Sequence, residues 1–527
     1  MTAAIDITAG QRKMLLALLR RYIPGVAVWA YGSRVKWTAR PNSDLDLVAF
    51  TTPEQQPLVS ELKEALAESD LPFLVDFHVW NEVPERFHEI IRKEYVLLQD
   101  VRQPEIGSAM VSGWPEVTLQ YAFEINPRRE AKRGTVTPFV PMDALPEHAR
   151  EIARIDIREY TGSGTRFKNG DTLLARITPC LENGKTAYVS GLEGDTVAHG
   201  STEYIVIAEK QNVSDGLFAY YLVRSPEFRS FAIGHMEGTS GRQRVPTEAI
   251  AKFQFDLPPL DEQKAIAHIL GTLDDKIELN RRMNATLEAM ARALFQSWFV
   301  DFDPVRAKLD CRQPTGLDAA TAALFPSHFQ ETPLGHIPQG WTASTVGEGF
   351  DLTMGQSPPG DTYNEDGDGI PFYQGRTDFG FRFPTRRVYC TAPTRYAKPG
   401  DALVSVRAPV GDINMADEEC CIGRGVAAVR HKSGAVSFTY HAMANLSPDF
   451  ARFEAEGTVF GSINKQNFEN LSFVIPPQEI VAAYEQIAKP IDDQIYTLEH
   501  QSRSLAALRD SLLPKLLSGE LSVTETP

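Results

Sequence analysis

The sequence predicts a multidomain α+β protein with an N-terminal α/β domain, two mixed α/β domains and two long helices that form an antiparallel coiled coil. The main observation is a duplication: a Pro-Pro pair opens a heptad pattern over 257–300, and both recur 218 positions later over 475–520. Each copy follows a segment of short β-type runs separated by Gly, Asn and Pro, at 107–256 and at 330–474. Residues 1–106 share none of this pattern and form a separate unit.

The two long helices are expected to begin after Pro258-Pro259 and Pro476-Pro477, because proline cannot sit inside a helix. A helix of roughly 38 residues is about 57 Å long at 1.5 Å per residue. Asn280 is the one polar residue at a seam position, of the kind that fixes register when buried. The predicted seam of the first helix is Ile266, Ile269, Leu273, Asn280, Met283, Leu287, Met290 and Leu294. Its counterpart is Tyr484, Ile487, Ile491, Ile495, Leu498, Leu505, Leu508 and Leu512. A lone heptad more often marks a helical bundle, but a repeated one favours pairing within the chain.

Length and composition restrict the possible classes of protein. A chain of 527 residues should hold about three or four domains. The net charge of −16 argues against a generic nucleic-acid coat protein, although a local basic patch can still bind phosphates. No apolar run reaches the roughly 18 residues of a membrane helix, and no secretory cleavage pattern is present, so we expect a cytoplasmic protein. Five scattered cysteines predict neither a disulfide framework nor a zinc site.

The first hundred residues contain a pattern of carboxylates typical of a metal site. A strand-like run, VAVWAY, leads into Gly32-Ser33, whose backbone N–H groups and hydroxyl can approach phosphate oxygens. Asp44 and Asp46 lie two apart on the next strand and so point to the same face. A third carboxylate, Asp76, lies on a later strand. Carboxylates gathered on one face are the ligands that a divalent cation needs, although an Asp-x-Asp pair alone also occurs at solvated strand ends.

The stretches GSRVKWTARPNSDLDLVAF and LVDFHVW resemble the minimal nucleotidyltransferases of the polymerase-beta superfamily. The resemblance extends through the closing helix at 90–94 and implies that Asp44, Asp46 and Asp76 hold two Mg²⁺ ions for transfer from ATP or another nucleoside triphosphate. By this resemblance Asp44 and Asp46 are shared ligands, and Asp76 is nearest the attacking hydroxyl. Trp37 departs from the family, which usually has glycine in that region. Such domains also persist as binding modules without activity.

Residues 107–256 and 330–474 share landmarks but differ strongly elsewhere. FKNGDTLLAR, which ends at Arg176, is mirrored by KPGDALVSVR, which ends at Arg407. Ser225-Pro226 is mirrored by Ser447-Pro448, and Gly238-Thr239 by Gly457-Thr458. A common scaffold with divergent loops indicates the same task performed on different targets. Residues 301–329 are expected to be a Pro-rich linker between the two halves.

This layout, with SWFVDFDPVRAK, LGHIPQGW, GDTLLARITP and two Pro-Pro-led coils, closely resembles the specificity subunit of Type I restriction–modification systems over residues 107–527. The resemblance implies two target recognition domains, each reading one half of a bipartite double-stranded DNA site. The coils would set the spacing and dock two methyltransferase subunits, and restriction/translocase subunits would join them. S-adenosylmethionine would belong to the methyltransferase, and this subunit would have no catalysis of its own. The N-terminal unit is then a fusion.

Candidate DNA-binding residues are polar and basic side chains in the variable loops, and the alternative for each is a solvated surface side chain. They are Arg176, Lys185, Arg242, Gln243 and Arg244 in the first repeat and Arg376, Arg407, Asn464, Lys465 and Gln466 in the second. Arg242-Gln243-Arg244 and Asn464-Lys465-Gln466 rank highest because they are expected in corresponding loops. An alternative treats the chain as an enzyme that adenylylates a protein or RNA, with the rest as a targeting arm. A scaffold that binds no DNA leaves the paired, divergent domains unexplained.

Overall fold

The computed structural model divides the chain into two compact units, Met1–Gly113 and Trp114–Pro527. The described residues are 5–23, 26–36, 43–51, 56–67, 69, 71–80, 83, 88, 91, 95–99, 113–239, 241–455 and 461–523. Trp37, the expected boundary at 106/107 and the Gly457-Thr458 landmark lie outside them.

The N-terminal unit is a four-stranded sheet with helices packed against it. The strand order is β3-β2-β1-β4, with β2 and β3 parallel and the other pairs antiparallel. The bounds are α1 (Ala9–Tyr22), β1 (Val28–Tyr31), β2 (Leu45–Ala49), α2 (Gln56–Ala67), β3 (Val75–Val79) and β4 (Val96–Gln99). Thr8 and Gln11 cap the start of α1 reciprocally, which fixes where the helix begins. This sheet carries the carboxylates predicted from the sequence.

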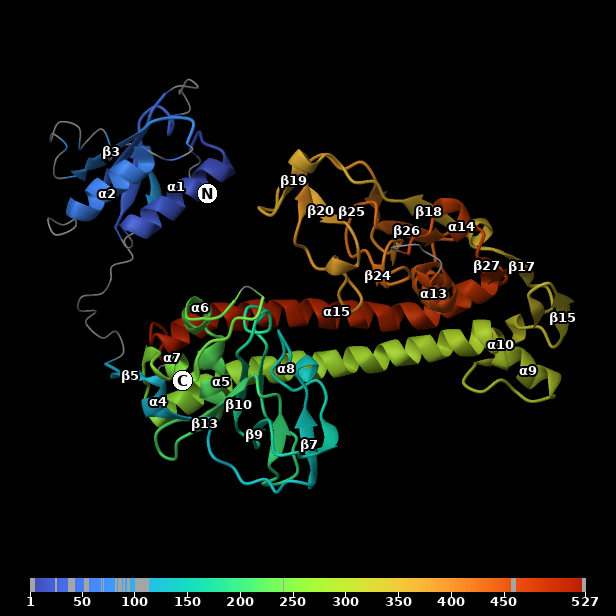
Figure 1. Ribbon diagram of the computed structural model, residues 1–527. Helices are drawn as coiled ribbons and strands as arrows, with labels where there is room; N and C mark the ends of the chain where they lie inside the picture. Colours follow the sequence, from blue (N-terminus) through green and yellow to red (C-terminus); the bar gives the residue numbers. More distant parts are fainter. Residues whose placement is uncertain are drawn as a thin grey trace. The chain divides into compact units, whose positions relative to one another are not determined.

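Two long helices, α8 (Leu260–Phe295) and α15 (Gln478–Leu517), run side by side through the second unit (Figure 1). Their contacts pair early positions of one with late positions of the other. Asp274 binds Arg509 at 2.6 Å, whereas the carbonyl oxygen of Ala291 accepts a hydrogen bond from Tyr484 at 3.4 Å. The helices are therefore antiparallel and in contact lengthwise, which confirms the predicted coiled coil.

The seam between the helices is more polar than the heptads predict. Asn280 is fully buried and donates to Gln501 Oε1 at 2.8 Å, as expected for a residue that fixes register. The prediction was wrong at two of the three alternate positions of the first helix, because Met283 and Met290 are exposed, whereas Ile269 packs against the core of the first domain. Ile487 and Leu508 are likewise exposed on the second helix. Polar and charged residues occupy the interior instead, namely Gln263, Asp274, Asn284, Glu288, Asp492 and Arg509.

The first recognition-type domain contains two four-stranded sheets, ordered β11-β10-β13-β6 and β8-β7-β12-β9. The strands are β6 (Phe123–Ile125), β7 (Val136–Val140), β8 (Asp156–Glu159), β9 (Thr165–Phe167), β10 (Thr172–Ala175), β11 (Thr186–Tyr188), β12 (Ala198–Gly200) and β13 (Tyr204–Glu209). The helices are α4 (Leu119–Ala122), α5 (Gly216–Arg224), α6 (Pro226–Gly234) and α7 (Thr247–Ala251). The antiparallel pair β5 (Glu116–Thr118) and β14 (Gln254–Asp256) joins the domain to the start of α8.

The second domain repeats this plan with a different outer sheet. Its inner sheet, β18-β26-β23-β24, has the strand order of β6-β13-β10-β11, and its outer sheet is β19-β21-β20-β25-β22. The strands are β17 (Thr342–Thr345), β18 (Phe350–Met354), β19 (Tyr363–Asn364), β20 (Ile370–Tyr373), β21 (Tyr389–Cys390), β22 (Tyr396–Ala397), β23 (Ala402–Ser405), β24 (Ile413–Met415), β25 (Cys420–Ile422), β26 (Val426–His431) and β27 (Ser472–Ile475). The helices are α11 (Val346–Gly349), α12 (Val436–Asn445), α13 (Ser447–Ala455) and α14 (Lys465–Glu469). Helix α5 packs on α8, and α12 packs on α15 and also contacts α8. The core of each domain includes residues of both long helices.

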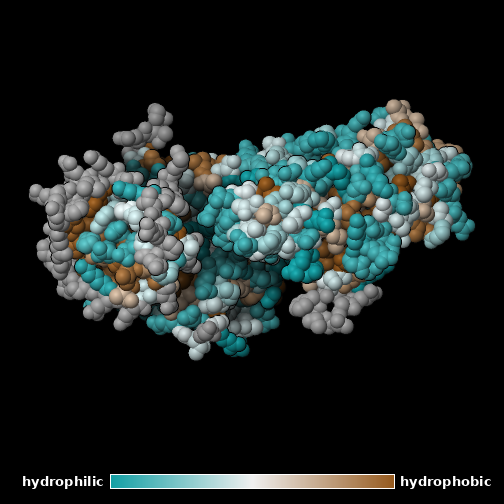
Figure 2. Space-filling view, turned by 90° about the horizontal axis from the view of Figure 1, so that it is seen from above, coloured by the Kyte–Doolittle hydropathy of each residue, from teal (hydrophilic) through white to brown (hydrophobic). Residues whose placement is uncertain are grey.

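The segment between the halves, which includes the Pro-rich linker expected at 301–329, is folded. Its elements are a π-helical turn (Gln296–Val300), α9 (Asp303–Leu309), α10 (Ala319–Leu324), β15 (Phe329–Thr332) and β16 (Gly335–Pro338). Phe302, Val305 and Phe325 are buried in the core of the second domain. Among the described residues no helix is long and apolar enough to cross a membrane. Hydrophilic residues cover most of the face shown in Figure 2.

Candidate functional sites

The N-terminal carboxylates lie at one end of the sheet. Asp46 on β2 lies directly opposite Asp76 on the parallel strand β3 and opposite Tyr31 on β1. Gly32 follows β1 with a φ of +82°, and a Cβ at this position would overlap the Asp46 carboxylate. The backbone after β1 therefore lies directly against the acidic side chains, as expected for a phosphate-approaching turn.

Repulsion within this group shifts its ionisation. Burial raises the pKa of Asp46, and the negative charges of Asp76 and Asp44 raise it further. Burial, followed by the negative charges of Asp46 and Asp76, raises the pKa of Tyr31 to about 12. A bound cation would relieve this repulsion. Mutual repulsion at one sheet end thus fits the chemistry of a cation site.

Three side chains at this site were missed by the sequence reasoning. Tyr31 faces Asp46, and His78 Nε2 lies 3.1 Å from an oxygen of Asp76. Arg34 is buried and donates to the Ser43 carbonyl at 2.8 and 3.0 Å, which ties the Gly-Ser turn to the start of β2. His78 has the same two-residue spacing from Asp76 that singled out Asp44 and Asp46, so its place could have been predicted.

The metal prediction rests on donor chemistry. Within the part of the chain that the structure describes, no three His, Cys, Asp or Glu side chains converge closely enough to hold a metal ion as they stand. The Asp44, Asp46 and Asp76 carboxylates are nevertheless the oxygen donors that Mg²⁺ prefers, and they are close enough to repel one another. Their assignment as ligands stays a prediction.

In the first recognition-type domain the structure brings two of the predicted loops together. Thr178 N donates to the Gln243 carbonyl at 3.0 Å, and Val245 N donates to the Arg176 carbonyl at 2.9 Å. Arg176 is half-buried, and its Nε has no hydrogen-bond partner among the described residues. Arg242 is exposed on the same loop. These residues form one polar surface next to β10.

Two predicted DNA-binding residues of this domain have internal partners. Arg244 forms a fork-like pair with Glu203, with N···O distances of 2.7 to 3.0 Å, and this hydrogen bonding holds the pKa of Glu203 below its usual value. Lys185 Nζ donates to the Met142 carbonyl at 3.2 Å. Both side chains therefore have a structural role available within the domain.

The second domain gathers its candidates around a pocket of about 470 Å³. Ala408 N donates to the Gly461 carbonyl and Ile463 N to the Val406 carbonyl, so the loops pair as in the first domain. The side chains that line the pocket and can contact an anion are Arg407, Arg424, Asn464 and Lys465. Arg424 was missed because only the fold brings the turn after β25 to this pocket.

The backbone hydrogen bonds show that the triplets Arg242-Gln243-Arg244 and Asn464-Lys465-Gln466 are not at the equivalent positions that the sequence suggests. Val245 and Ile463 make the same backbone hydrogen bond, so Pro246 corresponds to Asn464. Asn464 caps α14 by accepting from Asn467 N at 2.8 Å, and Lys465 and Gln466 begin that helix. The two triplets therefore occupy one loop–helix segment but are displaced by four positions.

The remaining candidates lie at the edges of this surface. Arg376 pairs with Asp412 at 3.0 Å, and Asp412 belongs to the loop that carries Arg407. Gln466 is exposed on α14 and Lys465 lies 3.5 Å from Glu469. Each domain thus presents a basic loop surface at the corresponding edge of its inner sheet.

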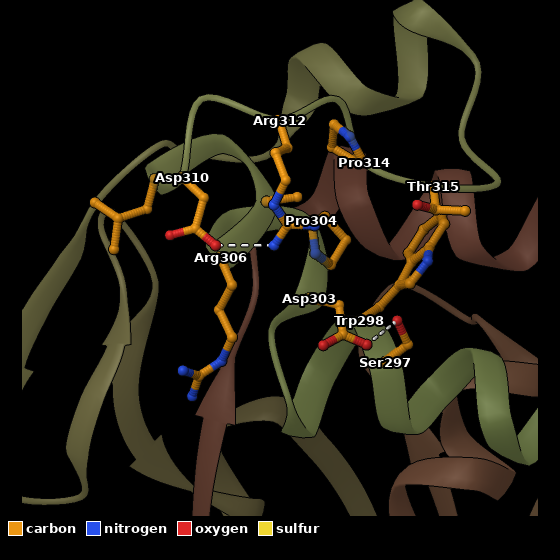
Figure 3. Close-up of a pocket in the computed structure, with 11 residues that line it drawn as sticks. Ser297, Trp298, Asp303, Pro304, Arg306, Asp310, Arg312, Pro314 and Thr315 are labelled. Carbon is orange, nitrogen blue, oxygen red and sulfur yellow. Dashed lines mark hydrogen bonds and ion pairs between the residues drawn. The ribbon is translucent and has the colours of Figure 1, made fainter.

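A further pocket of about 430 Å³ lies where α8 ends in the π-helical turn (Figure 3). Its polar lining is internally paired: Ser297 donates to Asp303 at 2.7 Å, and Arg312 contacts Asp310 at 2.8 Å. Arg306 is exposed and donates to the Asp301 carbonyl. Residues of the SWFVDFDPVRAK motif and the segment after it line this pocket, and none of them belongs to either basic loop.

Fold and sites together define a class: a scaffold in which two related mixed α/β modules, each with a basic loop surface, are mounted on one antiparallel coiled coil. The chain belongs to the family described as the type I restriction modification DNA specificity domain, whose model matches residues 124–289 and 338–508. Residues 14–103 match the polymerase beta nucleotidyltransferase family. Both resemblances inferred from sequence motifs are confirmed.

Similar proteins cover both parts of the chain. A Methanocaldococcus jannaschii protein that carries the name type I restriction enzyme MjaX specificity subunit is 27% identical over 381 residues, which cover 71% of this chain and 83% of the relative. A Haemophilus influenzae protein that carries the name protein adenylyltransferase MntA is 42% identical over 99 residues, which cover 19% of this chain and 87% of the relative. The crystal structure of the HsdS subunit from Thermoanaerobacter tengcongensis is 28% identical in sequence. The match covers 78% of this chain and 97% of that subunit, with a TM-score of 0.31.

Proposed function

We propose that this chain is the DNA-specificity subunit of a Type I restriction–modification complex, with each recognition domain reading one half of a bipartite site. The observation that carries the proposal is the pair of basic loop surfaces, one on each of the two domains that pack on the same coiled coil. DNA phosphates bind Lys and Arg side chains, and base edges are read by the same loops in a groove. The coil would fix the separation of the half-sites.

Arg424 and Arg407 support a DNA contact in the second domain. Both guanidinium-bearing residues are exposed, and both line the pocket beside Asn464 and Lys465. Such local positive charge suits phosphate binding although the chain is acidic overall. On the first domain Arg176 and Arg242 would take the equivalent role.

The outer face of α8 supports docking of a methyltransferase subunit on the coil. Leu279, Met283 and Met290 are 50%, 38% and 54% exposed and follow the i, i+4, i+11 spacing of one helical face. An apolar stripe of this kind suits the apolar face of a partner helix. We propose two methyltransferase subunits, which would carry the S-adenosylmethionine, and restriction/translocase subunits that join the assembly.

The test is co-expression of this chain with the methyltransferase and translocase subunits, followed by mapping of methylated adenines. We expect a two-part motif with a fixed gap. Arg242→Gln and Lys465→Gln should each weaken binding of the mapped DNA, and Lys252→Gln supplies a charge-matched control outside the proposed surfaces. An assembly that methylates no bipartite motif would refute the proposal.

The N-terminal unit supports a second candidate function, transfer of a nucleotide from ATP or another nucleoside triphosphate to a protein or RNA. Asp44, Asp46 and Asp76 would hold Mg²⁺, which would neutralise phosphate charge during transfer. Gly32 and Ser33 would approach the triphosphate, with Gly32 required because its backbone lies against Asp46. The observation that favours this function is the position of Asp46 directly opposite Asp76 on the parallel strand, where a cation would offset the charges of both carboxylates.

Labelled ATP with Mg²⁺ tests this second function. We expect incorporation into a co-purifying component, abolished by Asp46→Ala and retained by Glu61→Ala, which removes an exposed carboxylate on α2 of the same unit. Asp44→Ala should leave DNA methylation by the assembly unchanged. Absence of label in every component would refute nucleotide transfer without affecting the specificity-subunit proposal.

A further inference from the structure

A buried arginine connects the second recognition domain to both long helices. Arg382 is fully buried, and its guanidinium contacts Glu288 of α8 and Asp492 of α15, the latter at 2.7 Å. It also lies 3.8 Å from the centroid of the Tyr440 ring in α12. One side chain thus joins three helices.

The neighbouring backbone strengthens this junction. Phe383 is 3% exposed and packs among Leu287 of α8 and Ile491 and Ile495 of α15. Arg503 of α15 donates to the Phe383 and Pro384 carbonyls at 3.2 and 3.1 Å. The segment is therefore held to the coil by both charge and apolar packing.

The first half of the coil handles the matching carboxylate differently. Asp274 lies 218 positions before Asp492, and it binds Arg509 of the opposite helix and the Tyr221 hydroxyl at 2.6 Å each. Its cation is supplied by the coil itself. In the second half the coil supplies two buried acids, Glu288 and Asp492. The coil's own Arg292 is 72% exposed and lies 3.5 Å from Glu288, whereas the buried cation that contacts both acids comes from the recognition domain. A buried carboxylate is costly without a partner, so this half of the coil is complete only with its domain in one orientation.

We propose that Arg382 is the positioning residue that fixes the second recognition domain on the coil and so determines the gap between half-sites that the protein accepts. This inference rests on the proposed DNA-specificity function. The fork of the guanidinium reaches one acid on each helix, so a rotation of the domain would break one contact or the other. Arg382 itself lies away from solvent and acts on DNA only through the placement of the loops.

The experiment measures binding of the assembled methylase to its mapped site with the native gap and with the gap changed by one base pair. One base pair moves a half-site by about 3.4 Å and rotates it by about 34°. The ratio of the two affinities is the readout, because partial unfolding lowers both affinities equally. We expect the unmodified protein to prefer the native gap by at least about tenfold, and Arg382→Met to reduce this preference to about threefold or less.

Two further variants make the result decisive. Arg382→Lys keeps the positive charge but loses the two-pronged guanidinium, so we expect an affinity ratio between those of the unmodified protein and Arg382→Met. If Arg382→Met does not fold, the ratio measured for Arg382→Lys tests the inference. Arg387→Met is the matched control, since Arg387 pairs with Asp378 inside the same domain at 2.8 Å. The inference would be overturned if the Arg382 variants kept the affinity ratio of the unmodified protein. It would also be overturned if Arg387→Met lost as much of the preference for the native gap as the Arg382 variants. Failure of the unmodified assembly to methylate a bipartite motif would instead remove the proposed function.

Discussion

Loss of Arg509 should destabilise the coiled coil measurably. Asp274 and Arg509 are 6% and 7% exposed, and their side chains meet at 2.6 Å. Arg509→Met leaves a buried carboxylate with only the Tyr221 hydroxyl as partner. Removing one partner of a buried ion pair costs about 3 to 5 kcal/mol. With a urea dependence of about 3 kcal/mol per M, a loss of 3 kcal/mol lowers the urea midpoint by about 1 M.

The assay is urea unfolding followed by circular dichroism at 222 nm, read in the transition that removes the helical signal. The double variant Asp274→Asn, Arg509→Met removes both charges and should recover at least about 1 kcal/mol of the loss. Lys489→Met is the control on the same helix, because its pair with Asp493 is exposed and contributes about 0.5 kcal/mol. A midpoint shift no larger than in the control, or a double variant no more stable than the single one, would refute a buried, energetically coupled pair.

Three further predictions concern other parts of the chain. Gly32→Ala should reduce labelled-nucleotide incorporation at least about tenfold, because the added Cβ overlaps Asp46 and the φ of +82° disfavours alanine. Arg424→Gln should weaken DNA binding by the assembly for all sequences and reduce the slope of log K against log salt by about one, measured by fluorescence anisotropy. Burial lowers the pKa of His431, so the stability it confers is complete above about pH 6.5 and is lost as the pH falls through the folded pKa. The unfolding midpoint of His431→Gln should therefore fall less than that of the unmodified chain between pH 7 and pH 5.

The duplication was predictable because it is written in residue spacing. Pro258 and Pro476 mark the starts of α8 and α15 to within two residues, and the two helices pair antiparallel as expected. The seam was less predictable, because α8 carries apolar residues on two faces. Met283 and Met290 fit a heptad but face outward, whereas the interior contains Glu288, which no hydrophobic pattern selects.

In the candidate sites, positions set by local sequence spacing could be predicted, whereas contacts between residues far apart in the sequence could not. Asp46 and Asp76 occupy neighbouring strands, as alternation along a strand and a shared sheet suggested. Arg244 could not be known to pair with Glu203, forty-one positions away, because that contact depends on the folded loops. Arg424 escaped notice for the same reason: only the folded sheet brings it to the pocket beside Arg407.

The charged interior of the coil also bears on how copies of this chain meet. If α8 paired with α8 of a second molecule in the same register, Ala291 would take the place of Arg509 opposite Asp274, since these positions are related by the duplication. Each such dimer would enclose two carboxylates without counter-charges, a heavy free-energy penalty. The buried charges therefore favour pairing of α8 with α15, and they disfavour association of two chains through two copies of α8.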